Sequence, residues 1–70
     1  MNLVNNYSRK VSALKNKLTH FGLDPVDWQI KESRPGEWVI FSQNHQDLQF
    51  VGVSIRQRTS WDWKLIQLAI

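Results

Sequence analysis

Few residues of this sequence have the types and the spacing that catalysis requires. His45 and Asp47 lie two residues apart in a polar segment, an arrangement in which a carboxylate can orient an imidazole base. The same composition is typical of a hairpin turn, and we interpret the segment as one. His20 falls near the end of a predicted helix, where a positive charge interacts favourably with the helix dipole.

The other reactive groups are dispersed along the chain. The acidic residues are scattered over predicted turns and strands, and no glycine-rich nucleophile elbow or phosphate-binding loop accompanies the serines and threonines. There is no cysteine, and two histidines cannot complete a structural metal site without carboxylate ligands. We therefore expect a protein that is not an enzyme, that carries no cofactor or metal, and that has no small-molecule substrate.

Basic residues offer another kind of chemistry, the binding of an anionic partner. The formal net charge is +3 and the sequence pI is about 9.7. Residues 1–23 contain four basic residues and no acidic one, which gives +4, whereas residues 24–70 contain five basic and six acidic residues, which gives −1. Such asymmetry is typical of proteins that bind nucleic acid or acidic partners. The residues that would contact nucleic acid are Arg9, Lys10, Lys15, Lys17, Arg56 and Arg58.

The placement of the charges on the predicted helix argues against a dedicated nucleic-acid surface. Lys10 and Lys17 lie at one edge of its apolar stripe, Lys15 at the other edge and Arg9 on the back. Lysines in such positions typically cover a buried stripe with their aliphatic stems. The four tryptophans could stack on bases, but their spacing fits a core equally well. Nucleic-acid binding is therefore our alternative hypothesis.

The elements that position these residues begin with an amphipathic helix over residues 4–21. Its apolar residues recur at intervals of three and four, and they are Val4, Tyr7, Val11, Leu14, Leu18 and Phe21. Asn2, Asn5 or Asn6 is expected to cap the first turn. Gly22 is expected to end the helix in the left-handed conformation, with Leu23 in contact with the last turn.

From residue 28 onward the pattern predicts β-structure. Segments rich in β-branched and aromatic residues predict strands at 28–33, 38–43, 48–57 and 61–70. Tight turns are predicted at residues 24–27, 35–36, 44–47 and 58–60. Because short turns join neighbours, we expect an antiparallel meander. The 70 residues and 8.3 kDa thus predict a single α+β domain, with one N-terminal amphipathic helix packed on a four-stranded antiparallel β-meander (α-β-β-β-β).

The lengths of the turns predict which residues share a face of the sheet. A two-residue first loop and a four-residue second loop place Ile30 opposite Phe41, and Phe41 opposite Phe50. A short third turn places Arg56 opposite Trp61, Ser54 opposite Trp63 and Gly52 opposite Leu65. The first face is then mainly aromatic, with Trp28, Ile30, Val39, Phe41, Leu48, Phe50, Trp61, Trp63 and Leu65. The second is mainly aliphatic, with Trp38, Ile40, Val51, Val53, Ile55, Ile66, Leu68 and Ile70.

One helix can cover only one of these two apolar faces. We expect it to cover the aromatic face, which has more area to bury, although a sheet curled over itself is another outcome. The aliphatic face is then the candidate contact surface, through Trp38, Ile40, Val51, Val53, Ile55, Ile66 and Leu68. We therefore expect a small non-catalytic protein-binding or regulatory module that self-associates as a homodimer.

The distribution of apolar residues also bears on where the protein acts. A hydrophobic content of 41% argues against disorder, and the longest apolar run, Trp38–Phe41, is too short for a membrane helix. No apolar segment typical of a secretory signal follows Met1. We expect a cytoplasmic protein.

Overall fold

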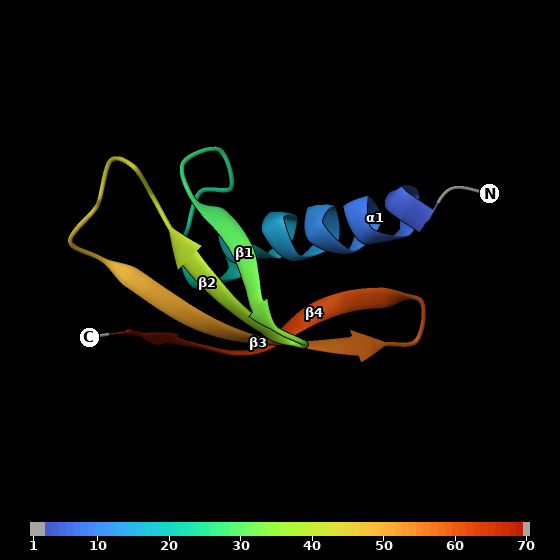
Figure 1. Cartoon of the computed structure of the whole chain (residues 1–70). Helices are drawn as coiled ribbons and strands as arrows, with labels where there is room; N and C mark the ends of the chain where they lie inside the picture. Colours follow the sequence, from blue (N-terminus) through green and yellow to red (C-terminus); the bar gives the residue numbers. More distant parts are fainter. Residues whose placement is uncertain (1–2, 70) are drawn as a thin grey trace.

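The described residues form a helical segment followed by a four-stranded sheet. The computed structural model describes residues 3–69, and side chains from Tyr7 onward. The α-helix α1 (Leu3–Asn16) continues into a 3₁₀ helix, η1 (Lys17–Phe21), and the strands are β1 (Gln29–Arg34), β2 (Glu37–Phe41), β3 (Gln49–Gln57) and β4 (Ser60–Leu68). The strands pair antiparallel in the order β1-β2-β3-β4, with α1 packed on one side of the sheet (Figure 1). The predicted α+β architecture is confirmed.

The end of the helix follows from its glycine. Gly22 has a φ of 80°, in the left-handed region, as predicted. The amides of Gly22 and Leu23 donate to the carbonyl oxygens of Thr19 and Leu18, each at 3.1 Å. These bonds satisfy carbonyls that a helix end otherwise leaves unpaired. Of the expected N-caps, Asn2 lies outside the described residues, whereas Asn5 and Asn6 lie inside α1 and therefore do not cap it, because the helix begins earlier than predicted.

The core forms where the second half of the helical segment meets the sheet. Leu14 and Leu18 are 0% exposed, and they pack in one cluster with Trp28, Trp38, Ile40 and Trp63. Trp38 and Trp63 meet edge to face, with centroids 6.2 Å apart and planes at 83°. The Nε1 group of Trp63 donates to the backbone carbonyl of Leu14 at 2.8 Å, which ties β4 to the helix from inside the core.

The register of the first two hairpins differs from the prediction by one residue. Arg34 pairs with Glu37 across the predicted two-residue loop, but Ser33 is an extra residue, so Ile30 pairs with Ile40 rather than with Phe41. The second loop comprises residues 42–48 instead of 44–47, and it pairs Ile40 with Phe50. Since side chains alternate between the faces, this shift moves every residue of β2 to the opposite face.

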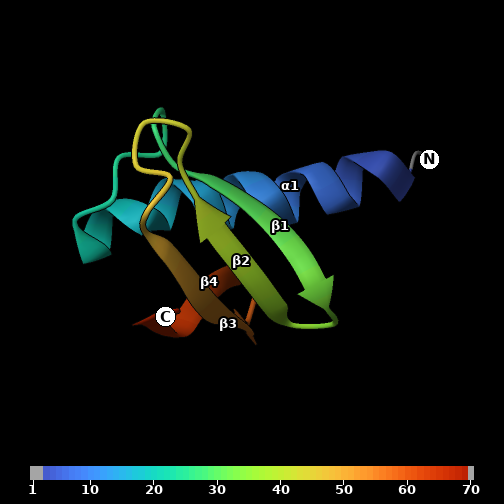
Figure 2. The same cartoon turned by 60° about the vertical axis from the view of Figure 1, so that its left-hand side comes forward.

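The register of the third hairpin, between β3 and β4, agrees with the prediction from the turn up to a second bulge. Arg56 pairs with Trp61 and Ser54 with Trp63, as expected. The register then shifts between Val53 and Ser54, so Gly52 pairs with Ile66 and not with Leu65. Bulges increase the twist of a sheet, and the strands are visibly twisted and curved (Figure 2).

These shifts overturn part of the predicted face assignment. Trp38 and Ile40 lie in the helix-covered core at 0% exposure, so their expected place on the uncovered face is wrong. Val39, Phe41 and Leu65 pair with residues of the uncovered face instead of lying under the helix. The expectation that the helix covers the tryptophans holds for Trp28 and Trp63, which belong to the buried cluster, and Trp61 packs against that cluster.

Candidate functional site

The sheet side that faces away from α1 carries a continuous apolar area, which we call the open face. Its apolar side chains are Val39, Phe41, Val51, Val53, Ile55 and Leu65. Val39 lies beside Val51, and Val53 beside Leu65, so the area crosses the three strands β2, β3 and β4. Ile55 is the most exposed of the six, at 38%. The twisted neighbours therefore shield these side chains in part, but no element of the described chain lies over them.

Part of the predicted contact surface lies on the open face, and the other predicted residues lie on the helix side of the sheet. Val51, Val53 and Ile55 lie on the open face, as predicted. Ile66 packs against the buried cluster, and Leu68 pairs with Phe50 on the helix side of the sheet. The new members of the open face are Val39, Phe41 and Leu65, which sequence reasoning missed because only the correct register reveals their direction.

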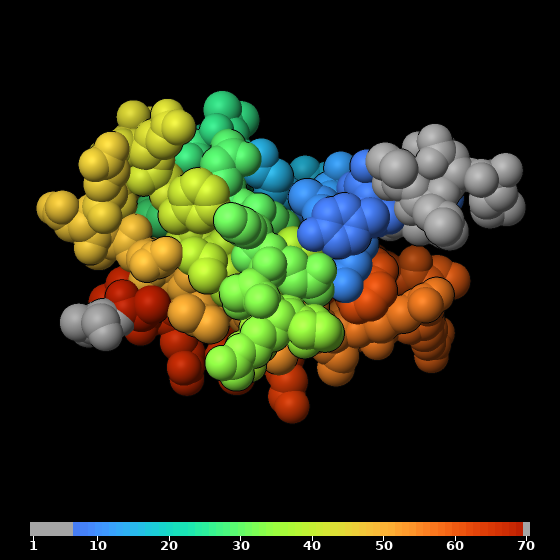
Figure 3. Space-filling view, viewed as in Figure 1, coloured from blue at the N-terminus to red at the C-terminus, as the bar shows by residue number. Residues whose placement is uncertain are grey.

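A second surface lies between the first half of α1 and the β3–β4 hairpin, and we call it the basic groove. It is an open hollow of about 750 Å³, lined mainly by Tyr7, Arg9 and Lys10 from the helix and by Arg56, Ser60 and Trp61 from the hairpin. Figure 3 shows these elements side by side at one end of the molecule, the helix in blue and the hairpin in orange. Within the described residues, no acidic side chain lines the groove.

Several cationic side chains lie close to Trp61. The Nζ atom of Lys10 lies 4.4 Å from the Trp61 ring centroid, and the Cζ atom of Arg56 lies 5.9 Å from it. Lys17 approaches from the far end of the helix and donates to the Trp61 carbonyl at 2.8 Å and to the Ser60 hydroxyl at 3.2 Å. The hairpin thus holds two lysines of the helix in place.

The structure brings together some of the predicted nucleic-acid residues and separates others. Arg9, Lys10 and Arg56 line the groove, while Lys17 binds the backbone and side chain of residues that line it. Lys15 lies on the other side of the helix, where its Nζ donates to Gln29 of β1 at 3.1 Å. Arg58 lies at the tip of the hairpin, in the two-residue loop between Gln57 and Ser60. Sequence reasoning did not indicate that Trp61 and Tyr7 accompany these charges.

The backbone at the hairpin tip leads to a prediction about stability. Arg58 has a φ of 52°, the only positive value among the described residues other than glycine. A side chain in this conformation costs about 1 kcal/mol, so Arg58→Gly is expected to raise the free energy of unfolding by about that amount. In thermal melting, the midpoint should rise by roughly 4–8 °C. Thr59→Gly is the control, because its φ is not positive, and it should not raise the midpoint. Equal midpoints for Arg58→Gly and the wild type would contradict the prediction.

His45 does not form the pair with Asp47 that the sequence allowed. Its Nε2 atom lies 3.5 Å from the Asp27 carboxylate, and its ring stacks on Trp28 with centroids 5.7 Å apart and planes at 8°. The neighbouring Asn44 also donates to Asp27. These contacts dock the β2–β3 loop on the connector between η1 and β1, so His45 is a residue that positions a loop.

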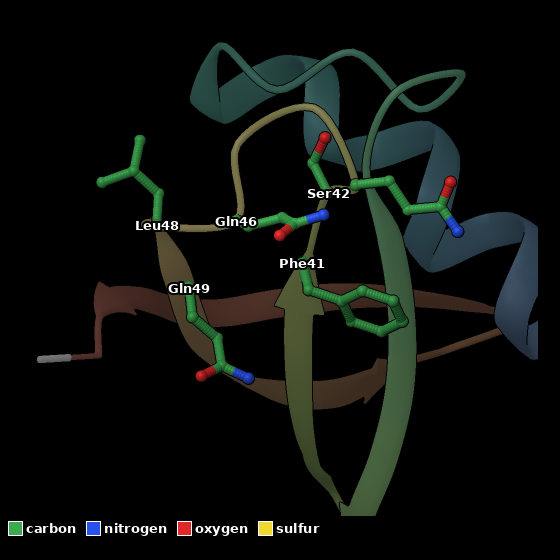
Figure 4. A pocket seen from close by; sticks show the side chains of 6 residues that line it. Phe41, Ser42, Gln46, Leu48 and Gln49 are labelled. Atoms are coloured by element: carbon green, nitrogen blue, oxygen red, sulfur yellow. The ribbon is translucent and has the colours of Figure 1, made fainter.

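A small hollow beside this loop is the remaining concave feature of interest. Figure 4 shows its lining, with Phe41 and Ser42 at the end of β2, and Gln46, Leu48 and Gln49 in the following loop and at the start of β3. Its volume is about 240 Å³, below the range of roughly 300–1,000 Å³ usual for small-molecule sites. Ser42 is buried and accepts a hydrogen bond from the Asn44 amide at 3.1 Å, as expected for packing within a loop.

The described residues also bear on membrane spanning and on metal binding. Neither helical segment between residues 3 and 69 has the length and apolar character needed to cross a bilayer. In that range, His, Asp and Glu side chains nowhere gather in a group of three that could hold a metal ion. Comparisons with models of protein families, with curated proteins and with solved structures find no match.

Proposed function

We propose that this protein is a small non-catalytic binding module that pairs with a second copy of itself through the open face. The observation that carries the proposal is the continuous apolar area over β2, β3 and β4, on the side of the sheet opposite to α1. Removing apolar area from water contributes about 25 cal/mol for each Å², before the costs of association. A domain of 70 residues has little core of its own, so this contribution is large relative to its stability.

The arrangement of the apolar side chains on the open face favours a second copy as the occupant. Val39 and Val51 lie side by side on the two central strands, β2 and β3. A twofold axis that runs along the strands between two facing sheets places β1 of one copy over β4 of the other, and β2 over β3. Because this axis leaves each residue at the same height along the strands, Val39 of each copy then lies over Val51 of the other, and the two open faces cover each other's apolar side chains.

The proposed pairing is of modest strength. A standard interface buries about 800 Å² on each partner, whereas the side chains of the open face are already shielded in part by their neighbours. Folding and pairing are therefore linked by mass action, and the melting midpoint depends on protein concentration. We place this activity in the cytoplasm, because a chain without cysteine gains nothing from an oxidising compartment.

The test is a lysine substitution on the open face. The wild type is expected to sediment with a mass that rises toward that of two chains as its concentration increases. Val53→Lys and Ile55→Lys are each expected to remain monomeric, because a charge would have to be buried between the two sheets. Their melting midpoints are expected to lose the concentration dependence of the wild type.

A matched control separates the interface from the general effect of a lysine. Val26 lies in the connector before β1 and is 86% exposed, so Val26→Lys should pair as the wild type does. Ile55→Lys serves where Val53→Lys fails to fold, since Ile55 lies beyond the end of β2 and is the more exposed. A wild-type protein that stays monomeric at every concentration would contradict the proposal.

A further inference from the structure

The residues that line the basic groove take no part in the proposed pairing through the open face. Three cationic side chains and two aromatic ones line it, drawn from segments far apart in the sequence. Arg9 and Arg56 are exposed, and neither makes an ion pair within the described residues. Two unpaired guanidinium groups across one hollow form a site for two neighbouring anionic groups.

Two lysines at the groove, Lys10 in its lining and Lys17 bound to residues of that lining, are held in place by other residues of the chain. Lys10 is fixed above Trp61 and also contacts the Glu32 carboxylate at 3.3 Å. Lys17 is fixed by its two hydrogen bonds to the hairpin. Because these side chains are already ordered, a ligand would lose less conformational entropy in meeting them than it would at mobile surface lysines.

The aromatic lining distinguishes between the possible anions. Tyr7 is 51% exposed, and its ring stacks on Trp38 with centroids 6.5 Å apart and planes at 25°. The ring is thus supported from the core side and is open toward the groove. A phosphodiester chain provides both a repeating anion for the arginines and a flat base for Tyr7. An acidic peptide provides only the anion.

The shape of the site favours a single strand. A protein that reads the bases of a B-form DNA duplex commonly inserts a helix or a β-ribbon into the major groove. Here the helix and the hairpin form the two walls of a hollow. The nucleic acid would therefore have to fit into the protein, which a single strand can do with its bases unpaired. We propose that the basic groove binds single-stranded nucleic acid, with phosphates at Arg9 and Arg56 and a base stacked on Tyr7.

The test is a titration of labelled single-stranded DNA and RNA oligonucleotides, followed by fluorescence anisotropy. Binding is expected at low salt for at least one of the two, and the logarithm of the binding constant should fall linearly with the logarithm of salt concentration. Arg9→Glu and Arg56→Glu should each weaken binding by about tenfold or more and should lower the salt slope by about one. Tyr7→Ala should weaken binding by roughly tenfold, through the loss of stacking.

Lys15→Glu provides the matched control. It changes the charge of the same helix by the same amount, but Lys15 lies on the side that faces β1. Its binding should remain within about twofold of wild type, apart from long-range screening effects. Circular dichroism checks that each variant is folded, and the exposed Arg9 keeps the test valid where Tyr7→Ala is destabilised.

Several results would overturn the inference. No binding to either oligonucleotide at low salt would remove it, and so would an equal loss for Lys15→Glu and Arg9→Glu, which would indicate attraction by net charge alone. Tighter binding to a duplex would show that the hollow is not the contact surface. Tighter binding to poly-aspartate than to the oligonucleotides would assign the groove to an acidic protein partner.

Discussion

Leu14→Asp is expected to abolish cooperative folding of this domain. Leu14 is 0% exposed and lies in the cluster that joins the helix to Trp28, Trp38 and Trp63. Burying an unpaired carboxylate there costs several kcal/mol. A domain of 70 residues has a free energy of unfolding of about 4–10 kcal/mol, so the cost of the substitution is comparable to the whole stability of the domain. Circular dichroism should show the loss of helix and of a melting transition.

The same substitution at an exposed position of the helix is the control. Ser12 lies two residues earlier in α1 and is exposed, so Ser12→Asp should alter the free energy of unfolding by about 0.5 kcal/mol or less. Leu14→Ala should give an intermediate loss of about 2–5 kcal/mol, from the missing methyl groups and the cavity they leave. If Leu14→Asp melts as the wild type does, the helix does not pack on the sheet through this residue.

The helix and the strands could be predicted because each is encoded by neighbouring residues. The spacing of Leu14 and Leu18 indicates the buried side of the helix, and Gly22 marks its end. The turn at Pro35-Gly36 also forms as its composition predicts, with Arg34 and Glu37 paired across it. These features need no information from distant parts of the chain.

The faces of the sheet could not be predicted, because small departures from regular pairing decide them. Ser33 carries no signal of a bulge, yet it shifts the whole of β1 against β2 by one residue. The second loop is longer than its polar residues suggest because His45 and Asn44 bind Asp27, a contact across 17 or more positions. Such tertiary contacts override local turn preferences. Trp38 consequently lies in the core, where Phe41 was expected, and Phe41 lies on the open face.

The candidate surfaces differ in how far the sequence indicated them. We interpret the lysines beside the helical stripe as residues that cover the core with their stems, and the structure shows that Lys10 and Lys17 contact the sheet through Glu32 and Ser60. The same geometry gathers Arg9 and Arg56, which are 47 positions apart, into one groove. Only the packing of the hairpin on the helix creates that proximity, so the composition suggested an anionic partner but could not show where it would bind.

Gly52→Ala is expected to lower the free energy of unfolding by about 2–3 kcal/mol, which is a large part of the stability of so small a domain. A Cβ atom at Gly52 would lie 2.5 Å from Cζ3 and 2.8 Å from Cε3 of the Trp63 ring, with the Ile40 Cδ1 atom at 3.2 Å. The ring cannot withdraw freely, because its Nε1 group is bonded to the Leu14 carbonyl and its edge meets Trp38. Chemical denaturation measures the loss.

A double-mutant cycle and a second glycine identify the cause of that loss. In a Trp63→Phe background the smaller ring leaves room for the added methyl group, so Gly52→Ala should cost less there, with a coupling of about 1 kcal/mol or more. Gly36→Ala adds the same methyl group where nothing lies within 4 Å, and its cost should be only the roughly 1 kcal/mol of a φ of 81°. Equal costs for Gly52→Ala in both backgrounds would mean that the Trp63 ring does not press on β3. The contact that holds the helix, the tryptophan pair and the sheet together would then have to lie elsewhere in the core.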